Sequence, residues 1–549
     1  MFINKNINLK NLFNQKILVS IFFLTYLIIG LYIFKDYGIS FDEDIQRIMA
    51  QNRIEYIQIF ISNFFSLLDN EVKNISITLP EHGVTFELPA LIIEKIFGFS
   101  DTRSEYLFRH LLIFLTSFIG SICFFKLVKK KFNSWKVGLI GVFLLITTPR
   151  IFAESFYNSK DIIFMYLFTI NTYFAIKFLD NPISSNSFYF ALFSGLCIGV
   201  RVIGIILPII TFYYLWIRFL RNDYKKNIRI KILIFFTSFI FFIILFFPSL
   251  WENPLKNFIY SLASFRSYDH EFLNFYLGQY VHPKTIHWYY FPLWIFITTP
   301  FIVIIIFIYG LVLSLYRIFN RLIRISKNKD LHDLWRGPIE FYDLFFITFI
   351  IAPIFLIIVF KSASYSGWRH LYFIYPFIII IGLVGLRFFY IKMLRINNMR
   401  IIIFFKVIFS FFLIYNIFWL YTNHPFQNNF FNFLAGDKPH RNYEVDYWGL
   451  SNKFVLEKII NEDNRKLINV SMISDTSLSH NINILTEEQK QKVNYVVDID
   501  KSDYIINNNI FFRGDFRKVR KILSNFDVYY ELFVDGTLVT TIYKRRYPI

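Results

Sequence analysis

The stretch "ILVSIFFLTYLIIGLYIF" (residues 17–34) decides the fold, and "KDYGISFDEDIQRIMA" (residues 35–50) follows it directly. The first segment carries no charged side chain and is long enough to cross a membrane as a helix. The second places three adjacent carboxylates, Asp42, Glu43 and Asp44, just beyond that span. Such acids ordinarily belong to a solvated loop or to the start of the next helix. Their place beside a membrane also makes them candidates for chemistry.

Composition extends this interpretation to the whole chain. The 549 residues are 55% hydrophobic and 21% aromatic, with a mean hydropathy of +0.45, whereas soluble domains are about 45–50% apolar. Cys123 and Cys197 both lie in apolar runs, which excludes a disulfide framework or a thiolate metal site. The net charge of +19 is spread over short clusters between apolar runs, so it does not indicate a nucleic-acid partner. The sequence predicts an α-helical polytopic membrane protein.

Eleven apolar runs are long enough to span the bilayer. They lie near residues 17–34, 106–126, 136–150, 161–179, 187–202, 204–218, 231–250, 290–315, 341–360, 371–390 and 400–421. The run 187–218 is interpreted as two short passes that turn at "IGVRVIG" (residues 198–204), and a re-entrant hairpin remains the alternative.

Lysine and arginine in short loops predict the orientation. They cluster at residues 5–16, 126–136, 218–229, 317–329 and 392–400, on one side of the predicted spans. We therefore expect a multi-pass protein of the plasma (inner) membrane with a cytoplasmic N-terminus.

The loops on the other side carry different residues. Segment 36–105 is the large first external loop and has 12 acidic residues against 5 basic ones. The remaining polar candidates on this side are Glu154, Asn158, Lys160 and Asp161 in "PRIFAESFYNSKDIIF" (residues 149–164), Arg201 in the turn at 198–204, and Arg369 and His370 in "KSASYSGWRHLYFIYP" (residues 361–376). Acids and arginines are thus expected at one membrane surface.

This combination suits group transfer from a phosphate-linked donor. Arginines hold phosphate through two parallel hydrogen bonds, and a carboxylate takes the proton of an attacking hydroxyl. Simpler explanations exist for each residue: Arg201 reaching the interface, Asp161 capping a helix, and Arg369 with His370 as ordinary polar residues at a helix start.

The order of these motifs resembles that of the GT-C type membrane glycosyltransferases. An Asp-Glu pair in the first external loop is similar to that of the protein O-mannosyltransferases and the aminoarabinose transferase of lipid A. The segments "PRIFAESFYNSKDI", "GWRHLYFIYP", "HPFQNNFFNFLAGDKP" and "YEVDYWGLSNK" resemble a bacterial branch of the glycosyltransferase 39 group. The resemblance covers most of residues 41–453.

The resemblance implies transfer of a sugar, with inversion, from a polyprenyl-phosphate carrier to a lipid, glycan or protein acceptor on the outer face. It implies catalytic roles for Asp42 as base, Glu43 and Asp161. Arg201, Arg369, His370, Asn158 and Glu154 are expected to bind substrate. Asp44 is expected to begin and cap the next helix. Mg²⁺ or Mn²⁺ held by Asp42, Glu43 and Asp161 is left open as a cofactor.

Two domains are expected. Residues 1–421 form the transmembrane catalytic module, and residues 422–549 form a small α/β domain outside the cytoplasm. Period-two segments such as "LINVSMIS" and "YYELFVDGTLVTTIYKR" predict strands in the second domain, with a hairpin at Asp535-Gly536. This domain is expected to cover the site, to help hold an acceptor, or to act as a stabilising appendage.

Other functions remain open for such a chain. A transporter or flippase of lipid-linked sugars also carries charges in its helix bundle, but it tends to show internal repeats, and none is found here. A polymerase or ligase of surface glycans would use similar external chemistry. A transporter should tolerate Asp42→Asn, whereas a transferase should not.

Overall fold

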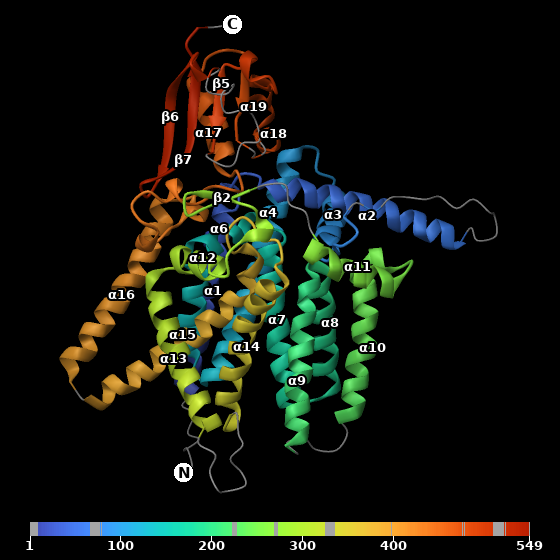
Figure 1. Ribbon diagram of the computed structural model, residues 1–549, viewed down its shortest axis with the longest axis vertical. Helices are drawn as coiled ribbons and strands as arrows, with labels where there is room; N and C mark the ends of the chain where they lie inside the picture. The colour runs from blue at the N-terminus through green and yellow to red at the C-terminus, as the bar shows by residue number, and fades with distance from the viewer. Residues whose placement is uncertain are drawn as a thin grey trace.

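A computed structural model describes residues 9–65, 77, 79–221, 228–267, 273–323, 335–396, 398–474, 476, 478–508, 521 and 523–547. Long helices run side by side through the lower part of the molecule, and a small domain with a sheet lies above them (Figure 1). The predicted basic loops at 222–227 and 324–334, and residues 1–8, lie outside the described residues.

Nine helical stretches of the described chain are long and apolar enough to cross a membrane, or ten if one bent pair counts as a span. They comprise α1 (Leu9–Ile33), α4 (Thr102–Phe132), α7 (Asp161–Asp180), η1 with α9 (Val202–Ile205 and Ile206–Leu220), α10 (Ile228–Phe246), α13 (Phe301–Ile323), α14 (Gly337–Phe360), η4 with α15 (Arg369–Ile374 and Tyr375–Ile396) and α16 (Met399–Thr422). The two predicted spans outside these nine are 136–150, which is the bent pair, and 187–202. Helix α8 (Ser184–Val200) has only 17 residues.

Prolines explain two further differences from the predicted spans. The expected helix 136–150 is divided into α5 (Trp135–Ile146) and α6 (Pro149–Tyr157), which meet at an angle of 72°. The expected helix 290–315 is divided into α12 (Tyr290–Thr298) and α13, with Thr299 extended before Pro300. The ring of a proline disfavours helical geometry in the residue before it.

The run 187–218 forms two passes, as predicted. Helix α8 ends at Val200, Arg201 is extended, and η1 opens the next pass. Lys231 of α10 bonds to Ser184 at the start of α8, 2.8 Å away, so this start lies at the lower end of the bundle. Since α8 runs from there to the upper end of the bundle (Figure 1), Arg201, which follows its last residue, lies at that end.

Helix α7 lies at the centre of the bundle, because most of its side chains are buried. It packs on α4 and α8, and α13 packs closely on α15 where Gly310 meets Gly385. A Cβ at Gly310 would lie 1.9 Å from the carbonyl oxygen of Ile381, so the two backbones touch there. Glycine permits this close approach.

Helix α2 and several shorter elements lie at the upper end of the bundle (Figure 1). They are α2 (Phe41–Phe65), α3 (Glu87–Phe97), η2 (Pro248–Leu250), α11 (Pro254–Ser267), β1 (Asn274–Tyr276), β2 (Gln279–Val281), η3 (Pro283–Thr285), η5 (Gln427–Asn429), η6 (Phe433–Ala435) and η7 (Pro439–Arg441).

The upper domain is a mixed sheet with helices. Its strands are β3 (Ile468–Met472), β4 (Val493–Tyr495), β5 (Tyr504–Asn507), β6 (Phe526–Val534) and β7 (Thr537–Arg545), in the order β4-β3-β5-β7-β6. Its helices are α17 (Ser451–Glu462), α18 (Leu478–Ile482), α19 (Glu487–Lys492) and η8 (Ile499–Lys501). β3 runs parallel to β4 and β5, whereas β7 is antiparallel to β5 and β6. The hairpin at Asp535-Gly536 is confirmed, with φ of 47° and 75°.

Candidate active site

The acidic motif "FDED" forms the first turn of α2. The backbone N–H of Ser40 donates to Glu43 Oε2 over 2.6 Å, and that of Phe41 donates to the Trp448 carbonyl over 3.0 Å. Because Glu43 satisfies the donor that precedes the helix, α2 begins at Phe41. The prediction that Asp44 begins and caps this helix is wrong: it accepts a 2.7 Å hydrogen bond from the Tyr106 hydroxyl instead.

Asp42 and Glu43 point to different partners. Asp42 Oδ2 accepts from Arg369 Nη1 over 2.6 Å, and the Asp42 side chain remains 25% exposed. Glu43 is only 1% exposed, and its Oε1 lies 2.9 Å from His110 Nε2. Asp42 is therefore the carboxylate of this pair that a substrate can reach.

Asp161 joins the same cluster from the start of α7. Asn158 Oδ1 accepts from the backbone N–H of Asp161 over 2.7 Å, so Asn158 supplies the cap and leaves the Asp161 carboxylate free for other partners. That carboxylate pairs with Arg201, and its second oxygen lies 3.5 Å from Arg369 Nη1. A buried chain thus links Asp42, Arg369, Asp161 and Arg201.

A third cation, Lys160, adds to the charge of this cluster. Burial and the neighbouring Arg201 lower the pKa of Lys160 to about 8, although Asp42 and Asp161 oppose the shift. Burial raises the pKa of Asp42, but Arg369, Lys160 and Arg201 outweigh it and hold the pKa below its usual value. With Lys160 protonated, three cations face two carboxylates, which leaves one positive charge in excess.

The first external loop approaches the same cations. Burial and then repulsion by Lys160, Arg201 and Arg53 hold the pKa of His82 well below its usual value. The backbone N–H of Thr85 donates to the Gly199 carbonyl over 3.4 Å, so this loop packs on the end of α8.

Glu154 lies behind the cluster and is fully buried. Its Oε1 accepts from the hydroxyls of Tyr372 and Tyr447 over 2.6 Å and 3.2 Å, and its Oε2 accepts from Asn158 Nδ2 over 2.6 Å. Asn158 Nδ2 also lies 3.4 Å from Asp161 Oδ2. In this arrangement Glu154 and Asn158 support Asp161, and direct contact with substrate remains a prediction for both.

Aromatic rings hold Arg369. Its guanidinium lies 4.6 Å from the ring centre of Trp448 and 4.9 Å from that of Tyr365. His370 packs edge-on against Tyr365, with ring centres 4.7 Å apart. The structure thus brings Arg369 into the acid cluster, while the predicted phosphate contact of His370 remains a prediction.

His110 is the main residue that the sequence interpretation missed. It is buried in α4, where its Nδ1 lies 3.3 Å from the Phe34 carbonyl oxygen. An ionisable residue inside an apolar span is a functional candidate by default, so the placement of His110 in the span 106–126 was the available signal.

The carboxylates proposed as metal ligands do not converge. Arg369 lies between Asp42 and Asp161, and Glu43 faces His110. Within the described ranges, no three His, Cys, Asp or Glu side chains are grouped to hold a metal ion. As arranged, these carboxylates do not form a binding site for Mg²⁺ or Mn²⁺.

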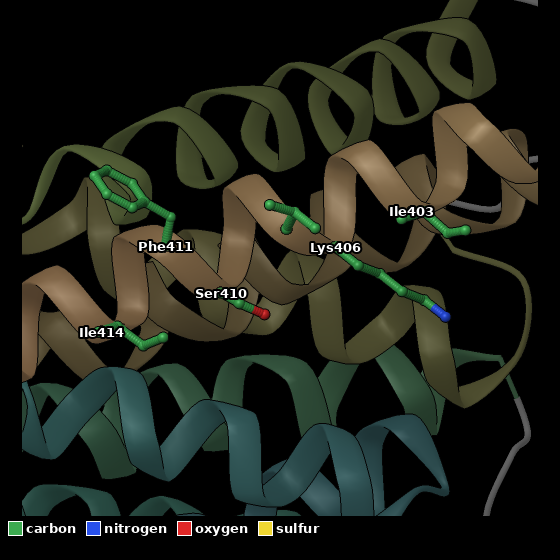
Figure 2. A pocket seen from close by; sticks show the side chains of 6 residues that line it. Ile403, Lys406, Ser410, Phe411 and Ile414 are labelled. Atoms are coloured by element: carbon green, nitrogen blue, oxygen red, sulfur yellow. The ribbon is translucent and has the colours of Figure 1, made fainter.

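A groove lined by side chains of α16 lies apart from the acid cluster (Figure 2). It is lined by Ile403, Lys406, Val407, Ser410, Phe411 and Ile414. None of the residues of the acid cluster lines it, and its walls are mainly apolar, so it belongs to the membrane-facing surface.

Comparisons with known proteins give one family match. Residues 87–251 match the dolichyl-phosphate-mannose-protein mannosyltransferase family, a segment that contains Asp161 and Arg201 but neither Asp42 nor Arg369. No curated protein matches the chain.

The solved structures that match the chain include the Archaeoglobus fulgidus oligosaccharyltransferase in its apo form. The identity is 11%, with 88% of this chain and 65% of that chain covered and a TM-score of 0.49. ArnT from Cupriavidus metallidurans, bound to undecaprenyl phosphate, gives 11% identity, coverage of 95% and 97%, and a TM-score of 0.41. The chain thus spans about 65% of the length of the oligosaccharyltransferase. The family match confirms, over residues 87–251, the resemblance to the GT-C membrane glycosyltransferases.

Proposed function

We propose that the protein transfers a sugar from a polyprenyl-phosphate carrier to an acceptor at the extracytoplasmic face of the membrane. The acceptor is a lipid, a glycan or a protein, and the anomeric configuration is inverted. The family match supports the class of donor, because the matched family is named for a polyprenyl-phosphate sugar.

The charge of the cluster carries this proposal. Arg201, Arg369 and Lys160 face Asp42 and Asp161, so the site holds one positive charge in excess. A sugar joined to a polyprenyl chain through phosphate is a phosphodiester with one negative charge. Donor binding would therefore neutralise the site, and the same cations would stabilise the phosphate as it departs.

The reaction requires one base and no acid for the leaving group. The acceptor oxygen attacks the anomeric carbon, the bond from that carbon to the phosphate oxygen breaks, and polyprenyl phosphate leaves with the bonding electrons. The acceptor proton passes to Asp42, which is the reachable carboxylate of the cluster. One displacement from the opposite face inverts the anomeric carbon.

Arg369 connects donor binding to the base. It is bonded to Asp42, which makes that carboxylate a weak base before the donor arrives. A donor phosphate that takes Arg369 as its partner would release Asp42 for the acceptor. Donor binding would thus precede acceptor activation.

The proposal is tested by mass spectrometry of glycolipids, surface glycans and glycoproteins from cells with the wild-type gene, without it, and with Asp42→Asn. We expect one sugar to disappear from one glycan class in the last two strains, with accumulation of the corresponding polyprenyl-phosphate donor. Unchanged glycans in both strains would contradict the proposal. Loss of the sugar only when the whole protein is absent would favour transport over transfer.

A further inference from the structure

The upper domain holds the backbone that precedes Asp42. Asn481 of α18 accepts from the Ile39 backbone N–H over 2.9 Å and donates to the Ile39 carbonyl over 2.9 Å. Asn481 is 1% exposed, so this amide pairs with both backbone groups of Ile39 away from water. Ile39 lies three residues before Asp42.

A lysine of the same domain holds the beginning of the segment. Lys453 Nζ of α17 donates to the carbonyl oxygens of Lys35 and Asp36 over 2.7 Å and 3.1 Å. Between these points Gly38 lies directly against the domain, since a Cβ there would be 2.6 Å from Asn481 Oδ1 and 2.8 Å from the Leu450 carbonyl oxygen. Hydrogen bonds to the upper domain therefore hold the segment 35–41 near both of its ends, and position 38 has no room for a side chain.

The chain that leads into α17 contacts Arg369 and the backbone of Phe41, the residue before Asp42. The Trp448 carbonyl accepts from the Phe41 backbone N–H, and the Trp448 ring lies against the Arg369 guanidinium. Asp446 fixes this turn by accepting from the backbone N–H groups of Leu450 and Ser451 over 3.1 Å and 3.0 Å.

We propose that Asn481 and Lys453 are positioning residues for the transfer reaction, and that the upper domain is thus a working part of the active site. The inference rests on the proposed function. Neither residue touches the reacting atoms. Both act through the backbone of residues 35–41, which sets where the Asp42 carboxylate lies relative to the acceptor.

The expected effect is large because general-base catalysis tolerates little displacement. A shift of about 1 Å in a reacting group costs roughly 100-fold in rate. Asn481→Ala removes both bonds to Ile39, so we expect kcat to fall about 10- to 100-fold. The donor KM should change little, since Arg201 and Lys160 lie on other elements.

The experiment measures position and rate in the purified full-length protein in detergent. Hydrogen exchange of the peptide covering residues 35–44 reports on the backbone, and transfer from a radiolabelled polyprenyl-phosphate sugar gives kcat and donor KM. The variants are Asn481→Ala, Lys453→Met and Gly38→Ala, the last of which inserts a methyl group between segment and domain. Asn494→Ala is the matched control. Asn494 lies on the exposed edge of the sheet in the upper domain, where its Nδ2 bonds to Asn469 over 2.9 Å.

Faster exchange over residues 35–44 together with a lower kcat and an unchanged donor KM, in Asn481→Ala and Gly38→Ala but not in Asn494→Ala, supports the proposal. Unchanged exchange, or faster exchange with normal kcat, would overturn it. If Asn481→Ala does not yield folded protein, Gly38→Ala and Lys453→Met carry the same test. Exchange does not depend on activity, so failure of the proposed function, seen as no transfer by the wild-type protein, is a separate result.

Discussion

At the scale of single residues, neighbouring acids of one motif differ through their partners. Asp42 is bonded to Arg369 and partly exposed, whereas Glu43 is buried against His110. Asp44 contacts Tyr106 and lies 3.2 Å from His480 of the upper domain. Asp42 and Asp44 are similarly exposed, at 25% and 22%, but only Asp42 joins Arg369 and Asp161 in the acid cluster.

The first prediction ranks these acids by their contacts. Asp42→Asn should abolish transfer because an amide accepts no proton, while donor binding and expression remain nearly normal. Asp161→Asn and Glu43→Gln should reduce transfer strongly, since each weakens a buried polar contact, with Arg201 and His110 respectively. Asp44→Asn should have little effect, because Asn still accepts from Tyr106. The measurement is the initial rate of sugar transfer in liposomes, and normal turnover by Asp42→Asn with inactive Asp44→Asn would refute the assignment.

The second prediction concerns pH. In the proposed reaction, protonated Lys160 would attract the donor phosphate, and its pKa of about 8 lies within the pH range of an enzyme assay. As pH rises through about 8 the cation is lost, so kcat/KM for the donor should fall with that apparent pKa. Lys160→Arg keeps the charge and should remove this fall. A fall that persists unchanged in Lys160→Arg would show that another group titrates.

At the scale of elements, the crossing of α13 and α15 depends on two glycines. Gly310 and Gly385 bring the backbones into contact, with 2.6 Å between the Cβ position of Gly385 and the Gly310 nitrogen. Helical glycine is ordinarily replaced by alanine at a gain of about 1 kcal/mol. Here the added methyl group would push two packed helices apart.

The third prediction is therefore that alanine at position 310 lowers the stability of the protein, the opposite of its usual effect in a helix. Gly310→Ala should destabilise the protein by about 1–3 kcal/mol, because a methyl group has no space between the backbones. Thermal unfolding in detergent measures this as a lower Tm. Val312→Ala, on the exposed side of the same helix, is the matched control and should be near neutral. A higher Tm for Gly310→Ala would show that the two helices are not in contact.

The sequence predicts which helices form better than it predicts where they begin and end or which side chains pair. Long apolar runs identify most spans. The turn at Arg201 was predicted because placing all the basic loops on one side of the membrane requires two passes over residues 187–218. The start of α2 was misplaced because the bond from Ser40 to Glu43 depends on side-chain geometry. The pairing of Asp161 with Arg201 joins residues of different helices, and spacing along a sequence does not give such contacts.

At the scale of the whole molecule, charge distinguishes the two ends. The lower end carries Lys130 paired with Asp180 over 2.8 Å, and Arg317 paired with Asp343 over 2.8 Å. The upper end carries the acid cluster and the small domain. The positive-inside tendency assigns the lower end to the cytoplasm, which would place the site and the domain outside.

The fourth prediction tests that orientation. Val497 is 84% exposed on the upper domain, so Val497→Cys should react with a membrane-impermeant thiol reagent in intact spheroplasts. The wild-type protein is the control, since Cys197 is buried and Cys123 lies within α4. Labelling of Val497→Cys only after lysis would reverse the orientation and place the site in the cytoplasm.

The contact between Asn481 and Ile39 joins residues 442 positions apart, and this separation has a consequence for biosynthesis. At ribosomal rates of roughly 5–20 residues per second, the segment 35–41 is made about 20 to 90 s before α18. The helices of the bundle would therefore enter the membrane while the segment before Asp42 still lacks its partners. A nascent chain would remain inactive until its last hundred residues have crossed the membrane and folded, so that only a completed polypeptide acts on the lipid-linked sugars around it.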